Sequence, residues 1–153
     1  MTNNRAEIPA KYKWDLTAIY PTEQSFWEDF AATEELVKKF PRHADTMLTS
    51  ADALADMYRD YFAIDRKINL LYEYAARNFD ADTTVNLYQS MTGKVINLAN
   101  DAGSASYFVT PYLLKLDAKT VRRWMEENSA LAEYRRAIEM TLRDQPHTLS
   151  DEC

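Results

Sequence analysis

One stretch of the chain, Ser50 to Arg77, carries apolar residues at alternating steps of three and four. The residues that follow this spacing are Leu54, Met57, Tyr61, Ile64, Ile68, Leu71 and Ala75. Because an α-helix repeats about every 3.6 residues, the spacing places all of them on one stripe of a helix. Ser50 can cap the start, and no Gly or Pro interrupts the run. The pattern therefore predicts a helical rod of roughly 40 Å.

A second stripe follows after a short polar link, Asn78 to Asp82. Its apolar residues again alternate by three and four: Tyr88, Met91, Val95, Leu98, Ala102 and Ala105. Asp82 can cap this second helix, which is predicted over residues 83–106. Two amphipathic rods with a short link are expected to fold back antiparallel and bury their stripes against each other. We therefore predict an all-α helical bundle built on a long antiparallel helical hairpin.

The composition restricts the class of protein. At 153 residues the chain is long enough for one domain, so residues 1–153 are expected to form a single helical domain with residues 1–10 loosely held. The net charge of -6 comes without a basic stripe, which counts against nucleic acid as a partner. The apolar runs are too short for a membrane span, and the start of the chain does not resemble a signal peptide. The single cysteine, Cys153, excludes an internal disulfide, and the cytoplasm is the expected compartment.

The segment KYKWDLTAIYP, Lys11 to Pro21, is too apolar for a free tail. Asp15 can cap a single helical turn that Pro21 ends. One interpretation is an anchoring segment packed on the bundle, and the other is an aromatic platform for a ligand. The tyrosines on or beside the two stripes likewise have two interpretations: they pack in the core, or they line a groove that binds a peptide. These tyrosines are Tyr58, Tyr61, Tyr72, Tyr74 and Tyr88.

The two histidines, His43 and His147, both fall in predicted loops. A catalytic zinc site needs three converging protein ligands, commonly including two histidines one helical turn apart. No H-E-x-x-H occurs in the sequence, and neither histidine has a second ligand at such a spacing. Both histidines are therefore interpreted as ordinary loop residues.

Two further groups of charged residues could form a site. Asp80 and Asp82 flank the link between the stripes, but a calcium loop needs more oxygen ligands and a glycine for its turn. The pairs Arg122–Arg123 and Arg135–Arg136 stand next to acids, which indicates solvated helix faces rather than phosphate sites. We predict no catalytic, cofactor-binding or metal-binding residue in this chain.

The last residues, Leu149 to Glu152, have the pattern of an N-cap followed by an acidic first turn. Ser150 would begin a helix for which no further residues follow, and we interpret this as a truncation. A lobe cut in this way is expected to leave an apolar or aromatic face uncovered, which favours self-association of the isolated chain.

Four stretches of the chain together resemble one family: YKWDLTAIYP, LLYEYAARNFDADTT, YFVTPYLLKL and RDQPHTLSDE. In this order they resemble the N-terminal lobe of oligoendopeptidase F, one of the thimet-oligopeptidase-like zinc metallopeptidases. The resemblance implies a helical, cytosolic enzyme that cuts short peptides in a channel between two lobes. It also implies a zinc ion held by H-E-x-x-H and a later glutamate in the C-terminal lobe, and none of these residues maps onto this sequence.

The resemblance makes this chain a non-catalytic wall of the channel, with the missing C-terminal catalytic lobe as its partner. An alternative is a free-standing helical interaction module that binds a peptide or a partner helix. A third is a self-sufficient enzyme of unknown chemistry. Encoding DNA that continues into an H-E-x-x-H segment would separate the first hypothesis from the second.

The purified chain is predicted neither to hold stoichiometric zinc nor to cleave peptides, because its sequence brings no set of three ligands together. Metal analysis after dialysis and a peptide-cleavage assay measure the two properties. One tightly bound zinc ion per chain would contradict the prediction and favour the self-sufficient enzyme. Weak binding of zinc at the surface through His43 or His147 would not contradict it.

Overall fold

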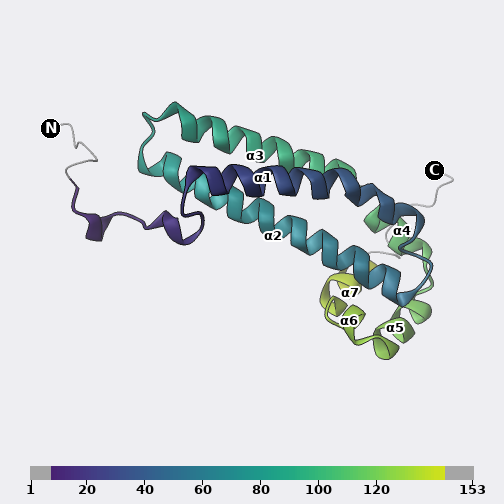
Figure 1. The fold of residues 1–153 in the computed structure, drawn as a ribbon. Coiled ribbons are helices and arrows are strands. Elements are labelled where there is room, and N and C mark those ends of the chain that lie inside the picture. Colours follow the sequence, from purple (N-terminus) through teal and green to yellow (C-terminus); the bar gives the residue numbers. More distant parts are fainter. Residues whose placement is uncertain (1–7, 144–153) are drawn as a thin grey trace. The chain divides into compact units, whose positions relative to one another are not determined.

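The computed structural model describes residues 8–143, and every regular element within this range is a helix (Figure 1). Three are short 3-10 helices: η2 Ala10–Tyr12, η3 Leu16–Ala18 and η4 Phe40–Asp45. The α-helices are α1 Glu23–Lys39, α2 Ala51–Ala81, α3 Asn86–Ala105, α4 Val109–Lys115, α5 Ala118–Glu127, α6 Ser129–Ala132 and α7 Arg135–Arg143. The predicted all-α class is confirmed. None of the helices between residues 8 and 143 has the length and hydropathy that a membrane span needs.

Several helix starts follow directly from capping residues in the sequence. The hydroxyl oxygen of Ser50 accepts a hydrogen bond from the Ala53 amide at 3.1 Å, as predicted for the start of α2. A carboxylate oxygen of Asp117 accepts from the Thr120 amide at 3.1 Å at the start of α5. Such caps satisfy amides that have no partner within the helix.

The link between the two predicted stripes is shorter than expected and shifted along the chain. Asn78–Ala81 form the last turn of α2, and α3 begins at Asn86. Asp82 Oδ1 accepts hydrogen bonds from the amide and the hydroxyl of Thr84, at 3.0 and 2.6 Å. Asp82 therefore stabilises the turn between the helices, because an Asp side chain readily binds the backbone two residues further on.

The chain divides into two compact units. The first comprises the chain up to Leu36 together with Ile64–Ala102, and the second comprises Val37–Ala63 together with the chain from Gly103. α2 contributes residues to both units. The single domain over residues 1–153 stays a prediction.

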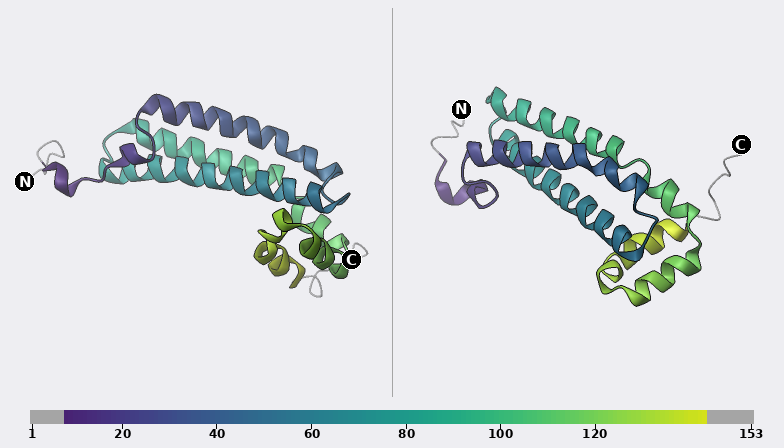
Figure 2. Two further views of the ribbon diagram at one scale, coloured as in Figure 1. Left: turned by 60° about the horizontal axis from the view of Figure 1, so that its bottom comes forward. Right: turned by 45° about the vertical axis from the view of Figure 1, so that its right-hand side comes forward.

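In the first unit, α1, the C-terminal part of α2 and α3 lie alongside one another (Figures 1 and 2). The chain turns after Ala81, and α3 returns beside α2. The buried apolar side chains of these helices are Phe26, Ile64, Leu71, Tyr74, Ala75, Ala76, Met91, Val95 and Leu98. Ile68, which was predicted to be buried, is half-buried.

The segment before α1 is held by Tyr20. Its buried ring lies edge-on to Phe26 and Tyr74, at centroid distances of 5.7 and 5.4 Å. Its hydroxyl donates to Asp29 Oδ2 at 2.6 Å, and the other oxygen of Asp29 is paired with Lys67. The predicted anchoring role therefore belongs to Tyr20.

Two other aromatic residues of this segment do not pack in the core. Tyr12 is 71% exposed and Trp14 is 60% exposed. The guanidinium of Arg77 lies 5.9 Å from the Trp14 ring centroid. The interpretation as an aromatic platform stays open for these two residues.

The second unit has its own core. Phe40 stacks on Phe108 at a centroid distance of 5.8 Å, α4 packs against α7, and α5 packs against α6. Leu54, predicted to be buried, belongs to this core. Its other large buried side chains are Val37, Phe40, Met47, Met57, Tyr58, Phe108, Val109, Leu113, Val121, Met125, Leu131, Ile138 and Leu142.

Leu71→Ala is predicted to lower the free energy of unfolding by about 2–5 kcal/mol, because it leaves a cavity in the core of the first unit. Leu70→Ala is the matched control, since Leu70 is the preceding residue of α2 and is 44% exposed. Its effect should stay within about 0.5 kcal/mol. Urea denaturation of both variants measures the difference. Equal losses would mean that the two leucines are not buried to different degrees.

Candidate functional site

His43 lies in η4 and is buried, with 6% of its surface exposed, whereas the sequence predicted a loop histidine. η4 follows α1 directly and has Pro41 in its first turn. Proline ends a preceding α-helix but is tolerated in the first turn of a new one, because that turn leaves its amides unpaired. The His43 ring packs 5.3 Å from the Phe40 ring. A polar side chain buried in this way requires a hydrogen-bond partner.

The partner is Asp60 of α2. His43 Nε2 and Asp60 Oδ2 are 2.9 Å apart, and Arg42 Nη2 donates to the same oxygen at 2.9 Å. Arg59 Nε lies 3.7 Å from the other carboxylate oxygen, Oδ1. One carboxylate thus joins two neighbouring side chains of η4 to α2.

The environment of Asp60 holds its pKa below the ordinary value of an aspartate. Burial by itself would raise the pKa, but the hydrogen bonds from His43 and Arg42 and their charges outweigh this effect. A group whose pKa is lower in the folded state contributes stability above its unfolded pKa. This contribution is lost as the pH falls through the folded pKa.

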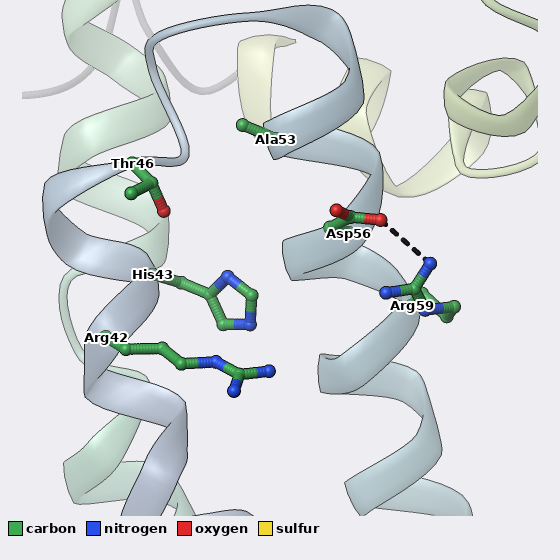
Figure 3. Close-up of a pocket in the computed structure, with 6 residues that line it drawn as sticks. All are labelled: Arg42, His43, Thr46, Ala53, Asp56 and Arg59. Carbon is green, nitrogen blue, oxygen red and sulfur yellow. Dashed lines mark ion pairs between the residues drawn. The ribbon is translucent and has the colours of Figure 1, made fainter.

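A cavity of about 390 Å³ opens beside this cluster (Figure 3). Its lining residues are Arg42, His43, Thr46, Ala53, Asp56 and Arg59. Figure 3 shows Arg42 and His43 extending from their segment toward the part of α2 that carries Asp56. Asp56 is already paired with Arg59 at 2.8 Å. The charges on the α2 side of the cavity are therefore balanced within the lining itself.

A histidine oriented by a carboxylate can act as a general base when a nucleophile lies within hydrogen-bond distance. His43 forms no side-chain hydrogen bond with a Ser, Thr or Cys residue among residues 8–143. What the described geometry of His43 and Asp60 supports is attachment of η4 to α2.

The other predicted candidates do not come together as a site. Asp80 pairs with Arg77 at 2.7 Å, while Asp82 binds Thr84 within its turn. Within residues 8–143, no group of three or more His, Cys, Asp or Glu side chains could hold a metal ion. His147 and the predicted helix start at Ser150 lie outside the described residues.

The tyrosines divide between the core and the surface. Tyr58 and Tyr74 are buried, Tyr88 is half-buried, and Tyr61 and Tyr72 are exposed. Burial raises the pKa of the Tyr58 phenol. Packing therefore accounts for Tyr58 and Tyr74, and the groove interpretation stays open for the others.

The arginine pairs also lie at the surface, as predicted. Arg122, Arg123, Arg135 and Arg136 are all exposed. Arg135 pairs with Glu139 at 3.5 Å.

Asp60 was not predicted from the sequence. It lies 17 residues after His43, and several other aspartates occur on the same helix. No local spacing separates the aspartate that meets η4 from the others, so only the packing of η4 on α2 identifies it.

Comparison with known proteins places this chain beside bacterial peptidases. A family model described as Oligopeptidase F matches residues 113–153. The chain is 28% identical to Oligopeptidase PepF of Bacillus subtilis (strain 168), over 97% of this chain and 22% of that protein. It is 34% identical to the chromosomal oligoendopeptidase F of Lactococcus lactis subsp. cremoris, over 98% of this chain and 25% of that protein. The chain thus spans about a quarter of the length of these curated relatives.

Solved structures share the fold. A candidate peptidase from Chlamydophila abortus has a TM-score of 0.82 and 23% identity, over 96% of this chain and 25% of that chain. Oligoendopeptidase-F from Enterococcus faecium has a TM-score of 0.74 and 23% identity, over 84% of this chain and 26% of that chain. The sequence and fold comparisons together confirm the resemblance derived from the four stretches.

Asp60→Asn is predicted to lower the free energy of unfolding by about 1–2 kcal/mol at neutral pH, because it weakens two charge-assisted hydrogen bonds in a partly exposed site. The difference from the unchanged chain should shrink below about pH 4, where an unfolded aspartate becomes protonated. Asp56→Asn is the control, since the side chains of Asp56 and Arg59 are 54% and 63% exposed. Its effect should stay below about 0.5 kcal/mol. Urea denaturation across this pH range measures the free energy of unfolding of both variants. A loss in Asp60→Asn that does not depend on pH would refute the lowered pKa of Asp60.

Proposed function

We propose that this chain, which is similar to the N-terminal portion of oligoendopeptidase F along nearly its whole length, is the non-catalytic N-terminal lobe of a zinc metallopeptidase that cleaves short peptides. The observation that carries the proposal is the share of each protein that the sequence match covers. The match extends over 97% and 98% of this chain but over only 22% and 25% of the two relatives. In this proposal the chain forms one wall of the substrate channel, in the cytoplasm.

In this proposal the zinc ion is held by the part of the peptidase that this chain does not span. The described residues do not fit a zinc ion, because residues 8–143 bring no three suitable ligands together. Bound zinc supplies Lewis-acid chemistry and an activated water in peptidases of this kind. The residues of this chain would position and enclose the substrate.

The helices of this chain support a surface that could line one side of the substrate channel. α2 is 31 residues long, and its buried residues serve the cores of both units. Asp29 and Asp60 tie neighbouring segments to α2 through Lys67, His43 and Arg42. A surface supported in this way keeps its shape when a peptide binds, and restricting access to short, flexible peptides requires that.

A free-standing interaction module is the second candidate. The observation that favours it is the exposure of large aromatic side chains: Tyr12 at 71%, Trp14 at 60% and Tyr107 at 75%. Aromatic residues of this kind commonly anchor protein interfaces. This candidate needs no catalytic lobe, and that difference separates the two by experiment.

The test is a chimaera in which this chain replaces the matching N-terminal quarter of the Lactococcus lactis enzyme. Cleavage of a short peptide should fall by about 100-fold when that quarter is deleted, because the substrate is then poorly positioned. The chimaera should recover most of the loss. The control is the same chimaera carrying Leu71→Asp, which places a charge in the core of the first unit.

A chimaera that is folded but no more active than the deletion would reject the lobe hypothesis. The interaction module would then be the better account. Circular dichroism and size-exclusion chromatography establish that the deletion variant and the unsubstituted chimaera are folded before their cleavage rates are compared.

A further inference from the structure

Two adjacent hollows lie along α7 in the second unit, with volumes of about 290 and 590 Å³. They share Glu133, Arg136 and Met140 in their linings. We call the surface they form the α7 groove. It is defined by Phe62, Glu133, Tyr134, Arg136, Met140 and Arg143.

The floor of the α7 groove is apolar. The rings of Phe62 and Tyr134 are stacked at a centroid distance of 5.6 Å and an angle of 9°. Both stack in turn on the buried ring of Tyr58, at 6.2 and 5.5 Å. Phe62 is 36% exposed and Met140 is 56% exposed, so an apolar surface on a rigid support faces solvent.

Two arginines stand beside this floor. Arg136, Met140 and Arg143 are spaced by four and then three residues, which places them on one face of α7. Arg135 is already paired with Glu139. Arg136 and Arg143, in contrast, form no ion pair with any carboxylate among residues 8–143. Among the described residues, the two hollows are lined by three arginines (Arg135, Arg136 and Arg143) and two acids (Glu133 and Glu139), so their linings carry a net positive charge on a chain whose net charge is -6.

We propose that the α7 groove binds an acidic peptide segment. One aromatic or aliphatic side chain of the peptide packs on Phe62, Tyr134 and Met140, and carboxylates on either side of it pair with Arg136 and Arg143. The two arginines are seven positions apart, which is roughly 10 Å along the helix. An extended peptide covers that length in about three residues. Because alternate residues of an extended peptide share one face, and arginine side chains are long, the recognised pattern is two acids about four positions apart with an apolar residue midway between them.

The arrangement favours a peptide over other anionic partners. A nucleic acid is bound through an extended row of cations that contact successive phosphates. Two arginines around an aromatic floor are too few for such a row, and the floor itself suits a single side chain. The proposal stands independently of the peptidase assignment, because it requires only residues of the second unit.

The test measures fluorescence anisotropy of a labelled short peptide with the whole chain. The peptide has two aspartates about four positions apart with one phenylalanine midway between them, in a Gly/Ser background. One comparison peptide has lysines in place of the aspartates, and another has glycine in place of the phenylalanine. The acidic peptide should bind more tightly than both, and its affinity should fall between about 50 and 300 mM salt.

Variants locate the binding surface. The double variant Arg136→Glu/Arg143→Glu should weaken binding of the acidic peptide by about tenfold or more. Arg122→Glu/Arg123→Glu on α5 makes the same change in net charge at exposed residues that line neither hollow, and it should change the affinity by less than about twofold. Glu133→Gln should tighten binding by about twofold because it removes the opposing charge. Arg136→Gln/Arg143→Gln keeps the test decisive if the glutamate variant does not fold.

Several outcomes would overturn the proposal. These are equal losses in the α5 and α7 variants, equal binding of the acidic and lysine peptides, and no binding of the acidic peptide. An oligonucleotide that displaces the peptide at lower concentration would assign the surface to nucleic acid instead. Sedimentation in which the α7 variants dissociate a dimer would assign it to a second copy of the chain.

Discussion

The continuous backbone hydrogen bonding of α2 is the constraint on which both units depend. The helix runs for 31 residues without glycine or proline. Its first part supplies buried side chains such as Leu54 and Tyr58 to the second unit, and its last part supplies Leu71 and Tyr74 to the first. Each unit therefore uses a segment of the same helix. A break in α2 would remove buried side chains from the core of one unit or the other.

Two carboxylate contacts attach other segments to this rod. Asp29 of α1 binds Lys67 of α2, and Asp60 of α2 binds Arg42 and His43 of η4. In each case hydrogen bonds to the carboxylate outweigh the cost of its burial, so the pKa of the acid is lowered. These contacts attach α1 and η4 to α2 in addition to their apolar packing.

The sequence predicted the helices well where one period repeats many times, and predicted side-chain partners poorly. The three-four spacing specifies the buried Leu71 and Met91, because a single helical stripe decides both. It does not specify the width of that stripe, so Tyr61 was predicted to face the core but is 37% exposed, whereas Tyr58 beside it is buried. Asp60 could not be predicted, since its partners come from η4 and nothing local distinguishes it from its neighbours. The resemblance to a known family came from several stretches taken together, and the comparisons confirmed that resemblance.

The sharing of α2 also has a consequence for how the chain reaches its folded state. Starting a helix is the unfavourable step, with a nucleation constant on the order of 10⁻³, whereas each further residue is added at little cost. Whichever unit forms first provides an established end of α2 from which the helix can grow into the other unit. The slow nucleation of this helix is therefore needed only once, and the second core condenses on a rod that already exists.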